Sequence, residues 1–376
     1  MCEVMTQKLV CTLPHLRASY DIEIHRGILN QQTHYLSSLA SRFAIITDDK
    51  VAHLYGEQLN QSLSSAGLKG HLFTFPNGEQ HKTRETKELI ENELFKNRLG
   101  RDTCVIALGG GVVTDIAGYL AATYCRGVPL VMIPTTLLGM VDASIGGKTG
   151  VNVPYGKNML GCIYQPKKVV IDPATLKSLP KKELANGIVE MIKHGLIADC
   201  ELFKYLEEHT TQLLALDSAV LEKAIFESCR IKKEIVEQDE KENGKRRLLN
   251  FGHTIGHALE NLTHYSLSHG EAVAIGILVE SYLSMQLGAL NQNCFDRIKK
   301  ILIQYTLPLQ LPYQIPIQAV LDMMTLDKKS LKGQPRFVII NRIGSPLAYD
   351  SNYCTCVEEP LIRKALQWMN DALYCH

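Results

Sequence analysis

The chain has 376 residues, more than a single hydrophobic core usually supports, so two domains are expected. Hydrophobic residues make up 45% and charged residues 21%, and the net charge of +1 excludes a basic field that would gather nucleic acid. No window approaches the ~20 apolar residues that a membrane helix needs, so we expect neither a nucleic-acid partner nor a membrane span.

The first part of the chain alternates short apolar segments with helical stretches. Continuous apolar runs between helices are typical of parallel strands that are covered on both faces. We therefore expect residues 1–179 to form an α/β, Rossmann-like domain. Its predicted strands are residues 20–24, 43–47, 72–75, 104–108, 130–134 and 168–172.

A glycine turn follows the clearest of these strands. Residues 104–108 run into Gly109-Gly110-Gly111 and then into a helical segment. Such a turn lets the backbone approach a phosphate, and the helix N-terminus points free N–H groups at it. The alternative is a tight turn without a ligand, although three glycines exceed its needs. Asp48 or Asp49, after strand 43–47, either binds an adenosine ribose or caps a helix.

Polar and basic residues follow the strand 130–134. Thr135 and Thr136 come first, and lysines stand among glycines in residues 142–150 and 156–158. Each lysine alone has the ordinary alternative of a solvated loop residue, but together they suit a multiply anionic small molecule. The candidate anion contacts are Arg126, Lys148, Lys157, Lys193, Lys232 and Arg246.

After Pro173 the pattern becomes helical. Residues 202–206, 213–225 and 272–287 show helical periodicity, and only residues 336–340 resemble a late strand or hairpin. We therefore expect residues 180–376 to form a mostly α-helical domain.

Three histidines in this second part indicate a metal site. His253 and His257 are four residues apart, which places both rings on one helix face, and His269 follows after a break. Glu190 supplies a carboxylate within an apolar helical turn. Imidazoles with one carboxylate bind divalent metals. The alternative is ordinary surface or core histidines, and the spacing leaves open which of them ligate.

The 11 cysteines are scattered and form no CxxC pair, which predicts free thiols in a reducing compartment. The first 20 residues lack the apolar run of a secretory signal. We therefore expect a cytoplasmic location.

The order of the motifs is informative across residues 20 to 345. They are GGGVVTD at 109–115, TYCRG at 123–127, PTT at 134–136, DASIGGKTGVN at 142–152, GKN at 156–158, EMIK at 190–193, LNFGHTIGHA at 249–258 and HGEAVAIG at 269–276. In combination they resemble the 3-dehydroquinate synthase family, within the sugar-phosphate cyclase superfamily.

The resemblance implies a dehydroquinate synthase-like fold and the conversion of 3-deoxy-arabino-heptulosonate 7-phosphate to 3-dehydroquinate and phosphate, in the shikimate pathway of aromatic amino acid biosynthesis. NAD would be required but not consumed, and the metal would be Zn²⁺ or Co²⁺ held by Glu190, His253 and His269. His257 would be an active-site residue beside the metal. Arg126 matches a position associated with the neighbouring subunit's site, which implies a homodimer.

The resemblance also assigns the remaining positions. Substrate-pocket positions are Asp142, Lys148, Lys157, Asn158, Lys193, Lys232, Arg246 and Asn250, with Lys328 or Lys329 from a further segment. Cofactor positions are Asp48, Glu79, Lys82, Gly110, Gly111, Val112, Val113, Thr114, Asp115, Thr135, Thr136, Lys148, Lys157, Thr175 and Ser178. The chain departs from the family pattern near the cofactor at Asn77, Thr114 and Ser178.

Three other functions are considered. A metal- and NAD-dependent alcohol or glycerol dehydrogenase would need no dense lysine cluster. A related cyclase acting on sedoheptulose 7-phosphate would not need Lys232, Arg246 and Asn250 for a substrate carboxylate. A non-enzymatic nucleotide-binding module would leave the histidine motifs without a role.

Overall fold

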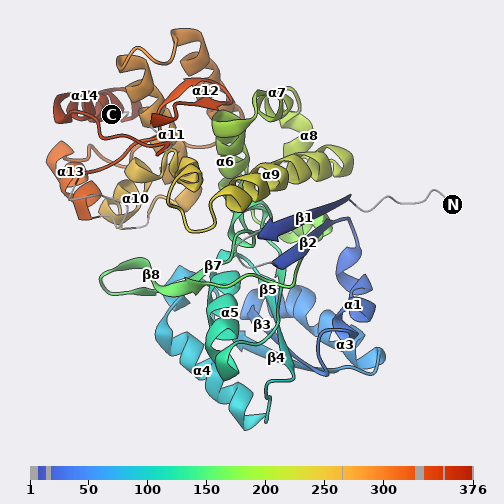
Figure 1. Cartoon of the computed structure of the whole chain (residues 1–376). Coiled ribbons are helices and arrows are strands. Elements are labelled where there is room, and N and C mark those ends of the chain that lie inside the picture. Colours follow the sequence, from blue (N-terminus) through green and yellow to red (C-terminus); the bar gives the residue numbers. More distant parts are fainter. Residues whose placement is uncertain (1–6, 14–17, 265, 327–333, 350–351, 375–376) are drawn as a thin grey trace. The chain divides into compact units, whose positions relative to one another are not determined.

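The computed structural model describes residues 7–13, 18–264, 266–326, 334–349 and 352–374 (Figure 1). The chain divides into two compact units. The first comprises residues 1–180 together with 221–237, and the second comprises residues 181–220 and 238–376. The sequence-based division at residue 179 did not include the return of 221–237 to the first unit.

A seven-stranded sheet forms the centre of the first unit, in the order β1-β2-β9-β6-β5-β3-β4. All neighbouring strands are parallel except β1 and β2, which form an antiparallel pair at one edge. Every residue of β5 is buried, as its uninterrupted apolar run predicts. The strands are β1 (Gln7–Leu13), β2 (Ala18–Ile24), β3 (Arg42–Asp48), β4 (Lys69–Phe75), β5 (Thr103–Gly109), β6 (Leu130–Pro134) and β9 (Lys168–Ile171).

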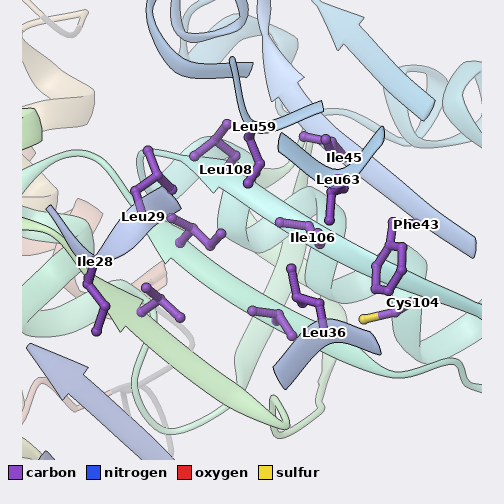
Figure 2. Packing of buried hydrophobic residues seen from close by; sticks show 13 residues of the cluster. Ile28, Leu29, Leu36, Phe43, Ile45, Leu59, Leu63, Cys104, Ile106 and Leu108 are labelled. Carbon is purple, nitrogen blue, oxygen red and sulfur yellow. The ribbon is translucent and has the colours of Figure 1, made fainter. Parts of the chain in front are cut away.

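Short helices connect these strands, and side chains at alternate positions of β3 and β5 pack under them (Figure 2). Phe43, Ile45, Ile106 and Leu108 belong to one buried cluster with Leu59 and Leu63 of α3. The packing fixes the strand ends from which the loops of the candidate site begin. The helices are η1 (Ile28–Gln31), α1 (Thr33–Ser37), α2 (Asp49–Val51), η2 (Ala52–Gly56), α3 (Glu57–Ser65), η3 (Glu79–His81), α4 (Arg84–Lys96), α5 (Gly111–Thr123), η4 (Tyr124–Arg126), η5 (Gly139–Ala143) and η6 (Pro173–Ser178).

The sequence did not predict the hairpin of β7 (Lys148–Val153) and β8 (Gly156–Ile163), which the glycine-rich segment suggested was a loop. Glycine is required where the two strands approach each other. A Cβ atom on Gly161 would lie 1.9 Å from the Thr149 carbonyl oxygen. These glycines make the segment resemble a loop in the sequence. They are also what permits the two strands to pair.

The second unit is mostly helical, and α11 is its central helix, buried along most of its length. A small hairpin, β10 (Ile340–Arg342) with β11 (Ser345–Pro346), begins at the last residue of the predicted late strand 336–340. Within that predicted strand, Phe337 makes only an isolated bridge with Thr355. Within the described residues, no helix is long and apolar enough to cross a membrane. The helices are α6 (Lys181–Ala198), α7 (Cys200–Glu208), α8 (Thr210–Leu214), α9 (Ser218–Gln238, mostly within the first unit), η7 (Lys245–Asn250), α10 (His253–Leu262), α11 (His269–Gln286), α12 (Gln292–Gln304), α13 (Ile317–Leu326) and α14 (Glu359–Leu373).

The predicted fold class, an α/β Rossmann-like domain followed by a mostly α-helical one, is therefore confirmed.

Candidate metal and cofactor sites

Three helices of the second unit bring a carboxylate and two imidazoles together. Glu190 lies in the middle of α6, while His253 and His269 are the first residues of α10 and α11. Oε1 of Glu190 lies 3.5 Å from Nε2 of His253 and 3.6 Å from Nε2 of His269. One ligand atom from each residue lies within 4.8 Å of the others. This donor set fits Zn²⁺ or Co²⁺ and leaves room for an exchangeable ligand.

Close packing of α10 against α11 places the two histidines side by side, with ring centroids 5.4 Å apart. Gly252, which precedes α10, has a φ of 79° that favours glycine. A Cβ atom on Gly276 of α11 would lie only 1.9 Å from the Gly252 carbonyl oxygen. The helices can therefore approach this closely only because these positions lack side chains.

The start of α11 is also tied to α6, which carries Glu190. Oδ1 of Asn186 accepts hydrogen bonds from the backbone N–H of Gly270 and from the Ser268 hydroxyl, both at 3.0 Å. Ser268 caps the helix in a reciprocal arrangement with Glu271. These bonds hold His269 in register with the carboxylate one turn beyond Asn186.

His257 lies beside this cluster but outside the group formed with Glu190. Its ring centroid lies 5.3 Å from that of His253 and 6.3 Å from that of His269. Nδ1 of His269 lies 3.4 Å from Oε2 of Glu260. Burial lowers the pKa of His269, but the hydrogen bonds to Glu190 and Glu260 more than offset this and raise the pKa to about 10.

Two buried cations lie in the same unit. Lys193 contacts Oε2 of Glu190, and both side chains are 1% exposed. Arg246 is also 1% exposed, and its Nη1 donates to the Glu240 carbonyl oxygen at 2.6 Å. Arg246 is therefore buried rather than part of a solvated basic face, although Lys245 and Arg247 flank it in the sequence. Cations this far from solvent require anionic or dipolar partners.

The segment that carries Arg246 also contains a residue that the sequence analysis missed. Nδ2 of Asn250 donates to Oε1 of Glu242 at 2.7 Å, and Glu242 has a φ of 62°, which is uncommon for a residue with a side chain. The sequence offers no motif for Glu242, because it lies in a charged run that is typical of a solvated loop. Its bond to Asn250 makes it a candidate site residue.

In the first unit, the glycine turn leads into the N-terminus of α5 as predicted. Gly110 precedes this helix and provides no side-chain cap, so the first N–H groups of α5 remain available to a phosphate. Thr114 is buried, and its hydroxyl donates to the Gly111 carbonyl oxygen at 3.1 Å. Oγ1 of Thr135, on the neighbouring strand end, is buried without a hydrogen-bond partner. The turn therefore fits a pyrophosphate.

The other predicted cofactor residues are held by separate contacts within the first unit. Asp48 caps α2 by accepting from the Val51 N–H at 2.9 Å, so its capping role is present. Thr175 and Ser178 meet at the Tyr55 hydroxyl, which lies 3.1 Å from the Thr175 carbonyl oxygen and 2.8 Å from Oγ of Ser178.

Glu79, Lys82 and Asp115 connect the η3 segment with α5 and with β7. Lys82 is buried against Asp115 of α5. Burial lowers the pKa of Lys82, but Asp115 and Glu79 more than offset it and hold the pKa above its usual value. Oε1 of Glu79 accepts from Asn152 of β7 at 2.8 Å.

The predicted substrate residues of the first unit fall on three segments. Lys232, 6% exposed on α9, contacts the carboxylate of Asp142 on η5. Lys148 begins β7, and Lys157 and Asn158 lie at the start of β8, where the Asn158 N–H donates to Oδ1 of Asn152 at 2.9 Å. The hairpin thus connects predicted cofactor and substrate residues.

Arg126 ends η4 on unusual backbone: its φ is 69°, that of Cys125 is 50° and that of Gly127 is 108°. Such a run is costly and is found where a side chain must be presented in one direction. Thr136 accepts from the Gly139 N–H at 3.0 Å. Lys328 and Lys329 lie outside the described residues.

Family models match nearly seven-tenths of the chain. The 3-dehydroquinate synthase N-terminal model covers residues 72–186, and the C-terminal model covers residues 187–330. The chain belongs to the 3-dehydroquinate synthase family. A 3-dehydroquinate synthase from Nitrosomonas europaea is 45% identical over 357 residues, which covers 94% of this chain and 95% of the relative.

Solved structures extend this comparison. A 2-epi-5-epi-valiolone synthase from Streptomyces hygroscopicus, with NAD⁺ and Zn²⁺ bound, is 30% identical with a TM-score of 0.86, covering 94% of this chain and 97% of that one. A 2-deoxy-scyllo-inosose synthase complexed with carbaglucose-6-phosphate, NAD⁺ and Co²⁺ has a TM-score of 0.88 at 22% identity, covering 98% and 100%. The latter likeness shows the fold that 3-dehydroquinate synthases share with it.

Proposed function

We propose that this member of the 3-dehydroquinate synthase family converts 3-deoxy-arabino-heptulosonate 7-phosphate to 3-dehydroquinate and phosphate, as a carbon–oxygen lyase. The observation that carries the proposal is a Glu190–His253–His269 cluster in the same unit as two buried cations, Lys193 and Arg246. The substrate of an alcohol dehydrogenase has no anionic group that could pair with buried cations. A substrate with both a carboxylate and a phosphate would pair with them.

Glu190, His253 and His269 would hold Zn²⁺ or Co²⁺, and the turn at Gly110 and Gly111 would hold the NAD pyrophosphate. When bound, the metal would supply polarisation of a substrate hydroxyl and NAD would supply reversible hydride transfer. The unpartnered hydroxyl of Thr135 supplies a hydrogen bond to the cofactor side of the site.

The chain's own residues would grip and orient the substrate. Arg246 offers a bidentate contact to the substrate carboxylate, and Asn250, held by Glu242, contacts a ring hydroxyl. His257 lies beside the metal cluster, where it can move a proton to or from the substrate. Lys148, Lys157 and Asn158 at the start of the hairpin strands would bind the phosphate. The Asp142–Lys232 pair of the first unit and Lys193 of the second unit would supply further charged contacts.

We further propose a homodimer and a cytoplasmic location. Arg126 supports the dimer. Its backbone has a positive φ, and such strain is concentrated at functional sites, which fits a cation that completes the site of a second subunit. The cysteines in the described residues are free thiols, in keeping with a reducing compartment. Sedimentation of the purified protein tests the dimer, and cell fractionation tests the location.

The deciding experiment follows phosphate release and NADH absorbance together. With the heptulosonate phosphate, NAD and Zn²⁺ or Co²⁺, we expect continuous phosphate release with no net NADH. One NADH formed per turnover would identify a dehydrogenase instead. Equal turnover of sedoheptulose 7-phosphate, which lacks the carboxylate, would identify a different cyclase and remove the role given to Arg246.

A further inference from the structure

Glu260 is a buried carboxylate to which the proposed reaction gives no role. It lies near the end of α10 and is 3% exposed. His253, His257 and Glu260 are spaced by four and three residues, which places them on one face of the helix. Removing a carboxylate from water is costly unless hydrogen bonds or charges compensate. Its position therefore calls for a partner on that face.

The partner is the imidazole of His269, which lies between two carboxylates. Oε2 of Glu260 lies 3.4 Å from Nδ1, and Oε1 of Glu190 lies 3.6 Å from Nε2. When Nδ1–H donates to Glu260, Nε2 keeps its lone pair on the side of Glu190 and is available to a metal ion. The negative charge of Glu260 also makes the ring a stronger ligand.

His253 shows the same arrangement with a different acceptor. Its Nδ1 lies 3.2 Å from the Phe251 carbonyl oxygen, while its Nε2 faces Glu190. A carbonyl oxygen can only accept, so this nitrogen carries the proton and Nε2 is left for the metal. When a metal takes the place of the Nε2 proton, both histidines would thus keep the Nδ1 proton, one on a backbone carbonyl and one on Glu260.

We propose that Glu260 is a positioning residue for the metal site: it accepts the Nδ1 proton of His269 and fixes the tautomer and orientation in which Nε2 binds Zn²⁺ or Co²⁺. This inference rests on the ligand set of the proposed function. Under this proposal α10 carries one ligand, His253, and also Glu260, which positions the ligand His269 of α11.

A rival geometry exists in the same residues. His257, Glu260 and His269 also offer ligand atoms within 4.8 Å of one another, so Glu260 itself could bind an ion. The two roles for Glu260 predict different numbers of bound metal ions per chain. A positioning role gives one metal ion per chain, whereas a second ligand group gives two in the wild type and one after Glu260 is changed.

The test uses Co²⁺ alone, titrated into the metal-free full-length protein and followed by its visible absorption and by competition with a chelator. Glu260→Leu removes the acceptor, and we expect Co²⁺ affinity to fall about 10- to 100-fold with an altered visible spectrum. Glu260→Gln retains an acceptor oxygen of the same reach, and we expect a smaller loss with a spectrum nearer that of the wild type. Glu280→Gln, which changes a fully buried carboxylate of α11, is the control for general destabilisation.

His269→Ala separates the failure of this inference from the failure of the ligand set. If His269→Ala loses Co²⁺ binding while Glu260→Leu binds with wild-type affinity and spectrum, the positioning role is wrong and the ligand set stands. If His269→Ala also binds normally, the ligand set itself is wrong. Two equivalents in the wild type and one in Glu260→Gln would make Glu260 a ligand. If Glu260→Leu does not fold, Glu260→Ala takes its place as the variant without an acceptor, and wild-type affinity and spectrum in that protein would overturn the proposal.

Discussion

Lys193 lies one helical turn after Glu190 on α6 and contacts its carboxylate, although both side chains are only 1% exposed. The pair has no access to water, so the charge of each depends on the other. A metal ion at the same carboxylate adds positive charge where a lysine already lies. If the proposed metal binds there, we expect the lysine to turn toward an anionic ligand, which would couple metal binding to the capture of an anionic substrate.

We expect Lys193→Met to destabilise the metal-free protein by about 3–5 kcal/mol, because it removes the lysine cation from a buried carboxylate and leaves only the neighbouring imidazoles to compensate it. Co²⁺ should then raise the melting temperature of this variant more than that of the wild type, since the ion replaces the lost charge. Calorimetry with and without Co²⁺ measures both. Lys181→Met, at an exposed position of the same helix, is the control. Equal Co²⁺-induced shifts in all three proteins would contradict the coupling.

Metal content should distinguish the two histidines that follow His253. His269→Ala removes a member of the Glu190 group and should bind much less Zn²⁺ or Co²⁺ after dialysis. His257→Ala lies outside that group and should retain close to one metal ion per chain while losing turnover. Elemental analysis checks both variants. A metal-free His257→Ala protein with a fully loaded His269→Ala protein would reverse the assignment.

Arg246→Lys should reduce kcat/KM by a factor of about 10 to 100, as expected for the loss of one charge-assisted contact of ~1.5–3 kcal/mol. Lysine keeps a donor for the Glu240 carbonyl oxygen but cannot reproduce the bidentate grip on a carboxylate. Co²⁺ and NAD binding should remain unchanged. Wild-type kinetics together with a lower melting temperature would mean that Arg246 only supports its loop, and Lys232 would become the carboxylate contact.

Asp239 should make the stability of the Arg246 segment depend on pH. Its carboxylate accepts from the backbone N–H groups of Asn243, Gly244 and Arg246. Burial raises the pKa of Asp239, but these bonds more than offset it and hold the pKa below its usual value. A depressed folded pKa stabilises the protein above the unfolded value of about 3.9 and loses that contribution as the pH falls through the folded value.

The variant Asp239→Asn should therefore be less stable than the wild type at neutral pH. The difference should stay constant down to about pH 5 and shrink below about pH 4. Chemical denaturation across this range measures it. A difference that persists unchanged at the lowest pH at which the protein folds would show that the carboxylate charge is not responsible.

Local patterns in the sequence predicted the parts of the fold that depend on local physics. The apolar runs around Ile45 and Ile106 predicted the parallel strands, and Gly109 to Gly111 predicted the turn into α5. The hairpin carrying Lys148 and Lys157 was missed, because glycines weaken strand preference while their cross-strand contact requires them.

In the metal cluster too, local spacing predicts some features and packing decides the others. The spacing of His253 and His257 predicts one helix face, but it cannot say which ring turns toward Glu190, because that depends on how α10 packs on α11. Glu242 and Glu260 were missed for a related reason. Their partners lie eight and nine residues away along the chain, a spacing that helical periodicity does not pair. The family resemblance supplied what local reasoning left open.

The glycine contact between α10 and α11 has a consequence for the metal site. Gly252 and Gly276 touch no proposed ligand atom, yet their lack of side chains sets how far apart His253 and His269 lie. Even a methyl group at Gly276 would push α10 and α11 apart and increase the distance between His253 and His269. A substitution at this interhelical contact would therefore change the fit of the ion while every proposed ligand stays unchanged.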